Sequence, residues 1–276
     1  MTLNVRNGDL QCYAVVYERG MRERFLKLYS FGEWNKKKRT IRLSEWETDE
    51  YKFRKEFAKV QRGWVVLDVG SEFGYYAIEA GHLVGGTGKV FAIEVHPETY
   101  RVLLINIRLH DLTDCVFPIC RAVGKETGTV KLFETTSPGS TSIVPRQSTI
   151  KLDRNRLRIW LNFAKSLEFL KIIRKRYAPV QYVVPMNTLD EIADECGIKK
   201  VDLIKIDVEG AEMDVLKGSQ QILQRDRPVL LVEVHFGWDW KPESLYALLR
   251  TFGYDLEIEK REQKSLVIAR PSERAL

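Results

Sequence analysis

The chain has 276 residues, of which 44% are hydrophobic, and it carries a formal net charge of +6. This length allows one large α/β domain, or one domain with a small addition. The chain contains no run of about 18 apolar residues, so we expect no membrane-spanning helix. Residues 1–10 lack the apolar stretch of a secretory signal, so we expect a cytoplasmic protein.

The cysteines do not indicate a metal centre. Cys12, Cys115, Cys120 and Cys196 include no CxxC pair. Two such pairs are the usual framework of a structural zinc site. We therefore expect reduced and mostly buried thiols and predict no metal at these positions.

The positive charge is concentrated in one segment. Residues 146–176 contain ten Lys or Arg and two acidic residues, which gives +8, so the rest of the chain sums to −2. A protein that binds nucleic acid over its whole surface would carry a more even positive charge.

The N-terminal residues 1–60 are predicted to form a lead-in. Short β-like runs lie at 12–17 and 40–43, and residues 48–61 have the pattern of a charged amphipathic helix. We place the boundary of the main domain at residue 61.

Residues 61–270 alternate between apolar strands and helices. Continuous apolar runs are typical of strands that are buried on both faces of a parallel sheet. The alternation breaks at a β excursion over 128–144 and at a basic insertion over about 146–180, and then returns. The predicted strands are 64–69, 89–94, 116–120, 201–207, 229–235, 254–259 and 265–269, and the predicted helices are 74–84, 97–110, 188–196, 211–224 and 243–252. This order predicts βαβ units and a parallel sheet, with the last two strands pairing as a hairpin.

A glycine loop follows the first strand of this domain. It contains Asp68, Gly70, Ser71, Glu72 and Gly74. In parallel sheets, ligands bind at the carboxyl ends of the strands, near such a turn. Gly70 allows a sharp turn and a close approach of the backbone to a ligand. Gly74 is expected to let the following helix pack close to the strand.

The loop is better suited to S-adenosylmethionine (SAM) than to a dinucleotide. A dinucleotide loop has the pattern GxGxxG, whose backbone approaches a pyrophosphate. Here the second glycine is absent, and the carboxylate of Glu72 would repel a pyrophosphate. SAM has no phosphate and carries a sulfonium and an ammonium group. Glu94 ends the second strand, twenty positions after Gly74, where a carboxylate can accept hydrogen bonds from ribose hydroxyls. A purely structural role for Asp68 and Glu94 is the alternative.

A second acidic cluster ends the strands at 201–207 and 229–235. The first strand leads to Asp207 and Glu209, and the second to Glu233 and His235. Carboxyl ends of neighbouring parallel strands meet at one edge, so these side chains are expected to converge. Together they predict a cleft with acids and a candidate base. A structural ion-pair network and a divalent-metal site are the alternatives, but the spacing fits no standard metal motif, and we predict no metal.

The residues that carry both features resemble the FkbM family of SAM-dependent methyltransferases. The similar stretches are 66–70 with 74–76, 92–94 with Pro97 and Asn106, 188–190, and 201–212 continuing through 215–218 to 231–235. The resemblance implies a class I methyltransferase (Rossmann-like) fold, with a seven-stranded, mostly parallel sheet and helices on both faces. It also implies SAM as methyl donor and O-methylation of sugars or natural products. Where the family usually has Ala-Asn, this chain has Ser71 and Glu72.

The predicted roles follow from methyl transfer to a hydroxyl, which needs its proton removed. His235, or one of Asp207 and Glu209, would serve as general base. Glu94 would hold the ribose. Gly70, Ser71 and Gly74 would line the methionine end of the cofactor. Asp68 and Glu72 complete the predicted cofactor site.

The acceptor is not inherited from the resemblance, because the insertion at 146–180 lies outside the family pattern. Its apolar residues have helical spacing between Arg and Lys, which predicts a basic amphipathic helix. Such a helix can be a lid, or can bind a membrane surface through 146–178, which would suit a lipid-linked acceptor. An RNA-modifying methyltransferase and a non-catalytic SAM-binding or nucleotide-binding module are the alternatives.

Overall fold

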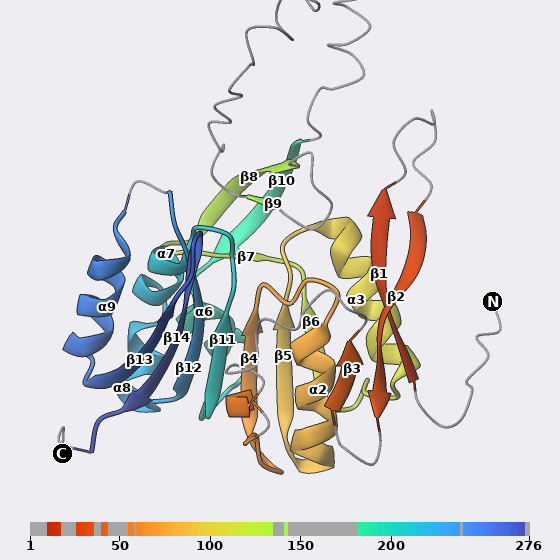
Figure 1. Ribbon diagram of the computed structural model, residues 1–276, viewed down its shortest axis with the longest axis horizontal. Coiled ribbons are helices and arrows are strands. Elements are labelled where there is room, and N and C mark those ends of the chain that lie inside the picture. Colours follow the sequence, from red (N-terminus) through yellow and green to blue (C-terminus); the bar gives the residue numbers. More distant parts are fainter. Residues whose placement is uncertain are drawn as a thin grey trace, which may run out of the picture.

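A computed structural model describes residues 10–17, 26–35, 40–43, 55–57, 59–134, 141–142, 181–237 and 240–273. Its central element is a seven-stranded sheet with the order β13-β14-β12-β11-β4-β5-β6 (Figure 1). The strands are β4 (Val65–Val69), β5 (Lys89–Ile93), β6 (Val116–Ile119), β11 (Leu203–Ile206), β12 (Val229–His235), β13 (Tyr254–Lys260) and β14 (Lys264–Pro271).

The strand directions confirm the predicted fold. Strands β12, β11, β4, β5 and β6 pair in parallel, and β14 runs antiparallel to both β12 and β13. The last two strands therefore form the predicted hairpin, which supplies one reversed strand. The carboxyl ends of the parallel strands meet at one edge, where a Rossmann-like sheet binds its ligands.

Helices cover both faces of this sheet and bury two apolar cores (Figure 1). One face is covered by α2 (Tyr75–Val84) and α3 (Pro97–Leu109). The other is covered by α6 (Leu189–Glu195), α7 (Glu212–Lys217), α8 (Gln220–Arg225) and α9 (Pro242–Thr251), and a short 3₁₀ turn, η2 (Gly85–Thr87), follows α2. Successive side chains of a strand point to opposite faces, so Val66 of β4 enters one core and Leu67 the other.

The single helix predicted over 211–224 is wrong, because the chain forms two short helices there. Gly218, between α7 and α8, lies so close to Gly124 that an added Cβ would be 2.1 Å from the Gly124 carbonyl oxygen. The carboxylate of Asp190 accepts hydrogen bonds from the backbone N–H groups of Gln221 and Ile222, at 2.9 and 3.0 Å. It thereby caps the second helix from outside, which a reading of local periodicity cannot reveal.

A four-stranded sheet of order β7-β10-β8-β9 lies beside the central one (Figure 1). Its strands are β7 (Ala122–Val123), β8 (Gly128–Glu134), β9 (Thr141–Ser142) and β10 (Gln181–Asn187). The predicted β excursion at 128–144 corresponds to β8 and β9. Strands β7 and β10 were not expected, since β7 is very short and Pro185 interrupts the pattern of β10. The basic insertion predicted at 146–180 lies outside the described residues.

The N-terminal region forms a three-stranded antiparallel sheet of β1 (Leu10–Tyr17), β2 (Leu26–Asn35) and β3 (Thr40–Leu43). It lies beside α3 and α2 (Figure 1). The strands predicted at 12–17 and 40–43 are confirmed, and β2 was not predicted. Of the helix predicted at 48–61, residues 55–57 are helical, 59–61 are not, and the others lie outside the described residues. The domain boundary near residue 60 stays a prediction.

No helix among the described residues has the length and apolarity needed to span a membrane.

Candidate active site

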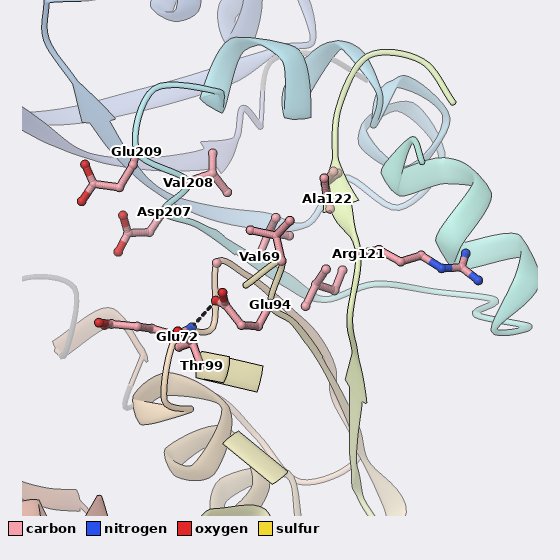
Figure 2. A pocket seen from close by; sticks show the side chains of 13 residues that line it. Val69, Glu72, Glu94, Thr99, Arg121, Ala122, Asp207, Val208 and Glu209 are labelled. Carbon is pink, nitrogen blue, oxygen red and sulfur yellow. Dashed lines mark hydrogen bonds between the residues drawn. The ribbon is translucent and has the colours of Figure 1, made fainter. Parts of the chain in front are cut away.

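A cleft opens at the carboxyl ends of β4, β5 and β11 (Figure 2). It contains about 670 Å³ of empty space, part of it open to solvent. It is lined by Val69, Gly70, Glu72, Ile93, Glu94, Val95, Thr99, Arg121, Ala122, Val123, Asp207, Val208 and Glu209. The predicted residues Gly70, Glu72, Glu94, Asp207 and Glu209 are therefore brought together, as expected from their strand ends.

Gly70 lets the ends of β4 and β11 approach each other closely. Its φ is +79°, and a Cβ at this position would be 1.8 Å from the carbonyl oxygen of Asp207. Its backbone N–H donates to the carbonyl oxygen of Ile93 at 2.9 Å, which ties the loop to β5. The position therefore requires glycine, and the cleft has a wall made of backbone.

Glu94 lies in the cleft wall with 7% of its surface exposed. Its Oε2 accepts a hydrogen bond from the backbone N–H of Glu72 at 2.9 Å, and its Oε1 accepts one from His96 N–H at 2.8 Å. Burial raises the pKa of this carboxyl to about 7, although both hydrogen bonds act to lower it. Each oxygen keeps a further lone pair that can accept a ligand hydroxyl.

Three predicted cofactor residues, Asp68, Ser71 and Gly74, do not line the cleft. Asp68 is fully buried, and Ser71 Oγ donates to the Asp68 carbonyl oxygen at 2.8 Å. At Gly74 an added Cβ would be 2.5 Å from Leu103 of α3. This glycine therefore allows close packing against α3, whereas the sequence predicted that it would let α2 pack close to the strand. These residues shape the loop from behind, and direct cofactor contact by them stays a prediction.

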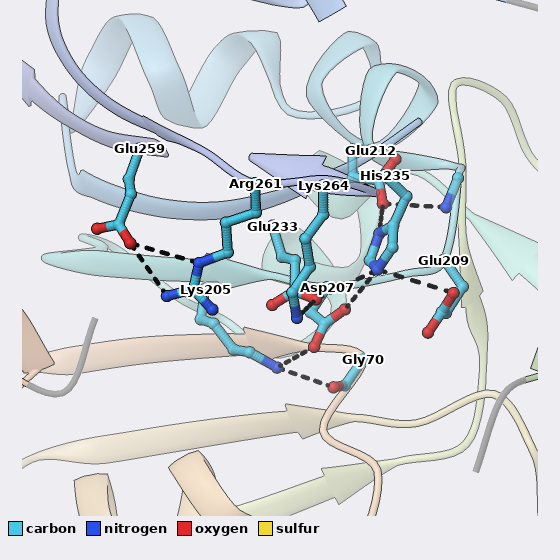
Figure 3. A network of polar contacts seen from close by, with 11 residues as sticks. Gly70, Lys205, Asp207, Glu209, Glu212, Glu233, His235, Glu259, Arg261 and Lys264 are labelled. Atoms are coloured by element: carbon cyan, nitrogen blue, oxygen red, sulfur yellow. Dashed lines mark hydrogen bonds and ion pairs between the residues drawn. The ribbon is translucent and has the colours of Figure 1, made fainter. Parts of the chain in front are cut away.

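Lys205 of β11 stabilises the glycine loop. Its Nζ donates to the Gly70 carbonyl oxygen at 3.1 Å (Figure 3). The same ammonium lies 3.4 Å from Asp207 Oδ2, 3.6 Å from Asp68 Oδ1 and 5.0 Å from the ring centre of Tyr76. Burial raises the pKa of Asp68, and the charge of Lys205 opposes that shift. The buried lysine thus links the two strand ends that form the cleft.

His235 lies at the centre of the second acidic cluster (Figure 3). Its Nδ1 is 2.7 Å from Glu212 Oε1. Its Nε2 is 3.2 Å from Glu233, 3.7 Å from Glu209 and 4.0 Å from Asp207. The predicted convergence of these side chains is therefore confirmed. Glu212, the first residue of α7, is a further member that tertiary packing adds.

The surroundings of His235 favour its protonated form. Burial alone would lower its pKa, but hydrogen bonds with Glu212 and Glu233, together with the charge of Asp207, raise it to about 11. Glu233 in turn has its pKa lowered by His235 and Lys264, which outweigh its burial. An imidazolium has no lone pair to accept a proton. The role of His235 as general base stays a prediction that this geometry does not favour.

Asp207, Glu233 and His235 also form a candidate metal-binding set. Each offers one ligand atom, and these atoms lie within 4.8 Å of one another. However, Lys264 Nζ contacts Glu233 Oε1, and the ring of His235 is close to all the carboxylates of the cluster. These two cations already pair with Glu233, one of the three candidate ligands, and the absence of a metal ion stays a prediction.

The cleft also contains residues that were not predicted, including Thr99, Arg121 and Ala122. Figure 2 shows the side chain of Arg121 pointing away from the acidic residues, and its guanidinium contacts Glu195 and Asn187. These residues carry no motif. Thr99 lies in the first turn of α3, after β5, and Arg121 and Ala122 follow β6. The carboxyl ends of both strands open on the same edge, which was the signal that could have indicated these residues.

Comparisons with known proteins identify the family. The profile of the Methyltransferase FkbM domain matches residues 68–256, more than half of the chain. Methyltransferase sdnD of Sordaria araneosa is 25% identical over 231 residues, which cover 74% of this chain and 80% of the relative. Hexuronic acid methyltransferase AglP of Haloferax volcanii is 37% identical over 82 residues, which cover 29% of this chain and 33% of the relative.

A solved structure of methyltransferase FkbM from Methylobacillus flagellatus has a TM-score of 0.46 and 14% identity to this chain. The match covers 78% of this chain and 50% of that one. The family assignment rests on the profile match, which contains the glycine loop, Glu94 and the whole acidic cluster up to His235. The chain belongs to the FkbM family of methyltransferases.

Proposed function

We propose that this methyltransferase transfers the methyl group of SAM to a hydroxyl oxygen of a glycan, lipid-linked or natural-product acceptor. The observation that supports SAM is the charge of the cleft. Glu72, Glu94, Asp207 and Glu209 line it, whereas the guanidinium of Arg121, which also lines it, contacts Glu195. A ligand with a sulfonium and an ammonium group fits such a wall, and a pyrophosphate would be repelled.

The carboxylate of Glu94 fits the role of ribose ligand. Its position at the end of β5 faces the cleft, and both oxygens are fixed by backbone N–H groups from Glu72 and His96. A fixed acceptor loses little freedom when two hydroxyls bind it. The backbone of Gly70 would lie against the methionine end, with Asp68, Ser71 and Gly74 holding the loop in shape.

When bound, SAM supplies an activated methyl group on a sulfonium. The chain must then orient the acceptor and remove its proton. We assign the role of proton acceptor to Asp207, whose side chain is 28% exposed at the cleft. The side chain of Glu209, beside it, is 35% exposed. The acceptor oxygen forms its bond to the methyl carbon, the carbon–sulfur electron pair stays on sulfur, and the hydroxyl proton moves to the carboxylate. His235 keeps its own proton.

A calorimetric titration with SAM and S-adenosylhomocysteine tests the cofactor assignment. Replacing the Glu94 carboxylate by an amide weakens the hydrogen bonds to the ribose, so Glu94→Gln should reduce SAM affinity by about tenfold or more. Glu243→Gln is the matched control, because Glu243 is an exposed acid at the start of α9. Equal SAM affinity of the Glu94→Gln variant and the unaltered protein would contradict the ribose assignment.

The acceptor can be identified with SAM that carries a labelled methyl group. Purified protein is incubated with cell lysate, and the lysate is then separated into lipid, glycan, RNA and protein fractions. Label in the glycan or lipid fraction would support the proposal. Label in RNA would instead favour the RNA-modifying alternative, and SAM binding without any labelled product would favour a non-catalytic module.

The basic segment at 146–178 is the candidate contact to a membrane surface. A basic amphipathic helix attracts anionic lipids through its charge and buries its apolar face in the interface. We propose a cytoplasmic protein that is peripheral at the membrane when its acceptor is lipid-linked. Binding to anionic vesicles, lost on deletion of residues 146–178, would support this location; equal binding by both proteins would contradict it.

A further inference from the structure

The ring of His235 is held between two groups of carboxylates that come from different elements. Glu212 of α7 contacts Nδ1 at 2.7 Å. On the Nε2 side are Glu233 of the same strand at 3.2 Å, and Glu209 and Asp207 after β11 at 3.7 and 4.0 Å. From β14, Lys264 contacts Glu233 (Figure 3). The two nitrogens of the ring therefore face different parts of the molecule.

The carboxylate of Glu212 is fixed in place. The residue is fully buried, and the same Oε1 that contacts His235 also accepts a hydrogen bond from Gly210 N–H at 2.9 Å. The carbonyl oxygen of Gly210 accepts in turn from Trp240 Nε1 at 3.0 Å. The turn after β11 is thus tied both to the buried carboxylate and to the indole. A side chain held this way loses little freedom on orienting a neighbour, unlike a surface ion pair.

The position of Glu212 determines which way the ring faces. An ionised carboxylate only accepts hydrogen bonds, so Nδ1 must carry a proton to bind it. With Nδ1 bound to Glu212, Nε2 faces Glu233 at 3.2 Å, and Glu209 and Asp207, which line the cleft, lie further out at 3.7 and 4.0 Å. A ring turned by 180° would lose the bond to Glu212 and leave that buried carboxylate with a single partner, Gly210 N–H.

We propose that Glu212 is a positioning residue for methyl transfer, which acts through His235 on the carboxylates of the cleft. This inference rests on the proposed function and extends it to a buried residue. Glu212 binds Nδ1–H, Glu233 lies nearest to Nε2–H, and the positive charge of the ring is thereby placed beside Asp207 and Glu209. The fixed positive charge of the ring attracts these two carboxylates and holds them at the place where the acceptor proton is released. Glu212 itself touches neither cofactor nor acceptor.

Kinetics of two variants test this role. Glu212→Ala removes the acceptor of Nδ1–H, and kcat should fall by about tenfold to a hundredfold, as for a misplaced catalytic group. SAM affinity and the KM for SAM should stay within about twofold, because Glu212 lies outside the cofactor wall. Glu212→Gln keeps an oxygen for Nδ1–H, so it should recover part of the lost kcat.

Glu56→Gln is the control for loss of a buried carboxylate. Glu56 is 8% exposed, and its partners are Arg270 and Lys59, not the cleft. This control should keep its kcat. Full kcat in Glu212→Ala, a loss confined to SAM affinity, or a Gln variant no better than Ala would each overturn the inference.

Nitrogen NMR of the unaltered protein tests the positioning without any turnover. The chain has four histidines, so the imidazole spectrum is simple, and His235→Gln assigns the signal. We expect both nitrogens of His235 protonated at neutral pH, with a slowly exchanging Nδ1–H. A His235 signal without a proton on Nδ1 would overturn the inference alone. Failure of the unaltered protein to bind SAM would instead overturn the proposed function, which separates the two results.

Discussion

The β5 side of the cleft and the His235 cluster on its β12 side use the same residue type in opposite ways. On the β5 side, Glu94 is buried against backbone N–H groups, and its pKa is raised to about 7. On the β12 side, Glu233 is buried against His235 and Lys264, which lower its pKa. Glu94 therefore has spare capacity for a ligand, whereas Glu233 is already paired with two cations. From this difference we infer that the β5 side binds the cofactor, whereas the β12 side positions the carboxylates that accept the proton.

The glycine loop between the two sides should be the most sensitive point. In Gly70→Ala the new Cβ would be 1.8 Å from the Asp207 carbonyl oxygen at a φ of +79°. Since both groups are backbone, the strand ends must separate. We expect loss of measurable SAM binding and a free energy of unfolding lower by about 3 kcal/mol or more. Urea unfolding and calorimetry check this; an Ala variant that binds SAM normally would show that the loop does not form the wall.

Substitutions on the catalytic side should lower kcat. Asp207→Asn removes the proposed proton acceptor, so kcat should fall by about a hundredfold. SAM affinity should change by less than about threefold, since Glu94 remains. Single-turnover assays with the identified acceptor measure this. Retained turnover in both Asp207→Asn and Glu209→Gln would remove the carboxylates from the mechanism and return His235 as the candidate base.

The binding side should respond to pH. The ionised form of Glu94 is the better acceptor for ribose hydroxyls, and its pKa is about 7. SAM affinity should therefore fall as the pH drops below 7, by about tenfold between pH 8 and pH 6. Calorimetric titrations at these pH values check it. In Glu94→Gln the same pH change should have little effect, and an equal pH dependence in both proteins would assign it to another group.

The stability of the folded protein should also depend on pH, through His235 on the catalytic side. His235 has a pKa of about 11 in the folded protein and 6.5 as its ordinary value. The folded state therefore binds the extra proton more tightly. This contribution is fully present below pH 6.5 and is lost progressively as the pH rises through 11.

Urea unfolding between pH 6 and pH 9 should show a steeper loss of stability in the unaltered protein than in His235→Gln. Parallel curves for the two proteins would mean that the imidazole is not held in its charged form.

The sheet and the cofactor side could be predicted from sequence because their requirements are local. A buried parallel strand shows as an apolar run, Gly70 as a turn that needs a positive φ, and Glu94 as an acid at the next strand end. The predictions that failed or were missing depend on distant partners. Asp190 caps α8 across 31 positions, and Gly218 packs on Gly124. Nothing near Glu212 in the chain indicates that it binds His235, since an acid in a first helical turn is already explained by the helix dipole.

The most direct test of the central claim is a crystal structure with S-adenosylhomocysteine. We expect both ribose hydroxyls to donate to Glu94, the homocysteine backbone to lie against Gly70, and the sulfur to face Asp207 and Glu209. A ligand bound away from this edge of β4 and β5, or with its ribose out of reach of Glu94, would contradict it.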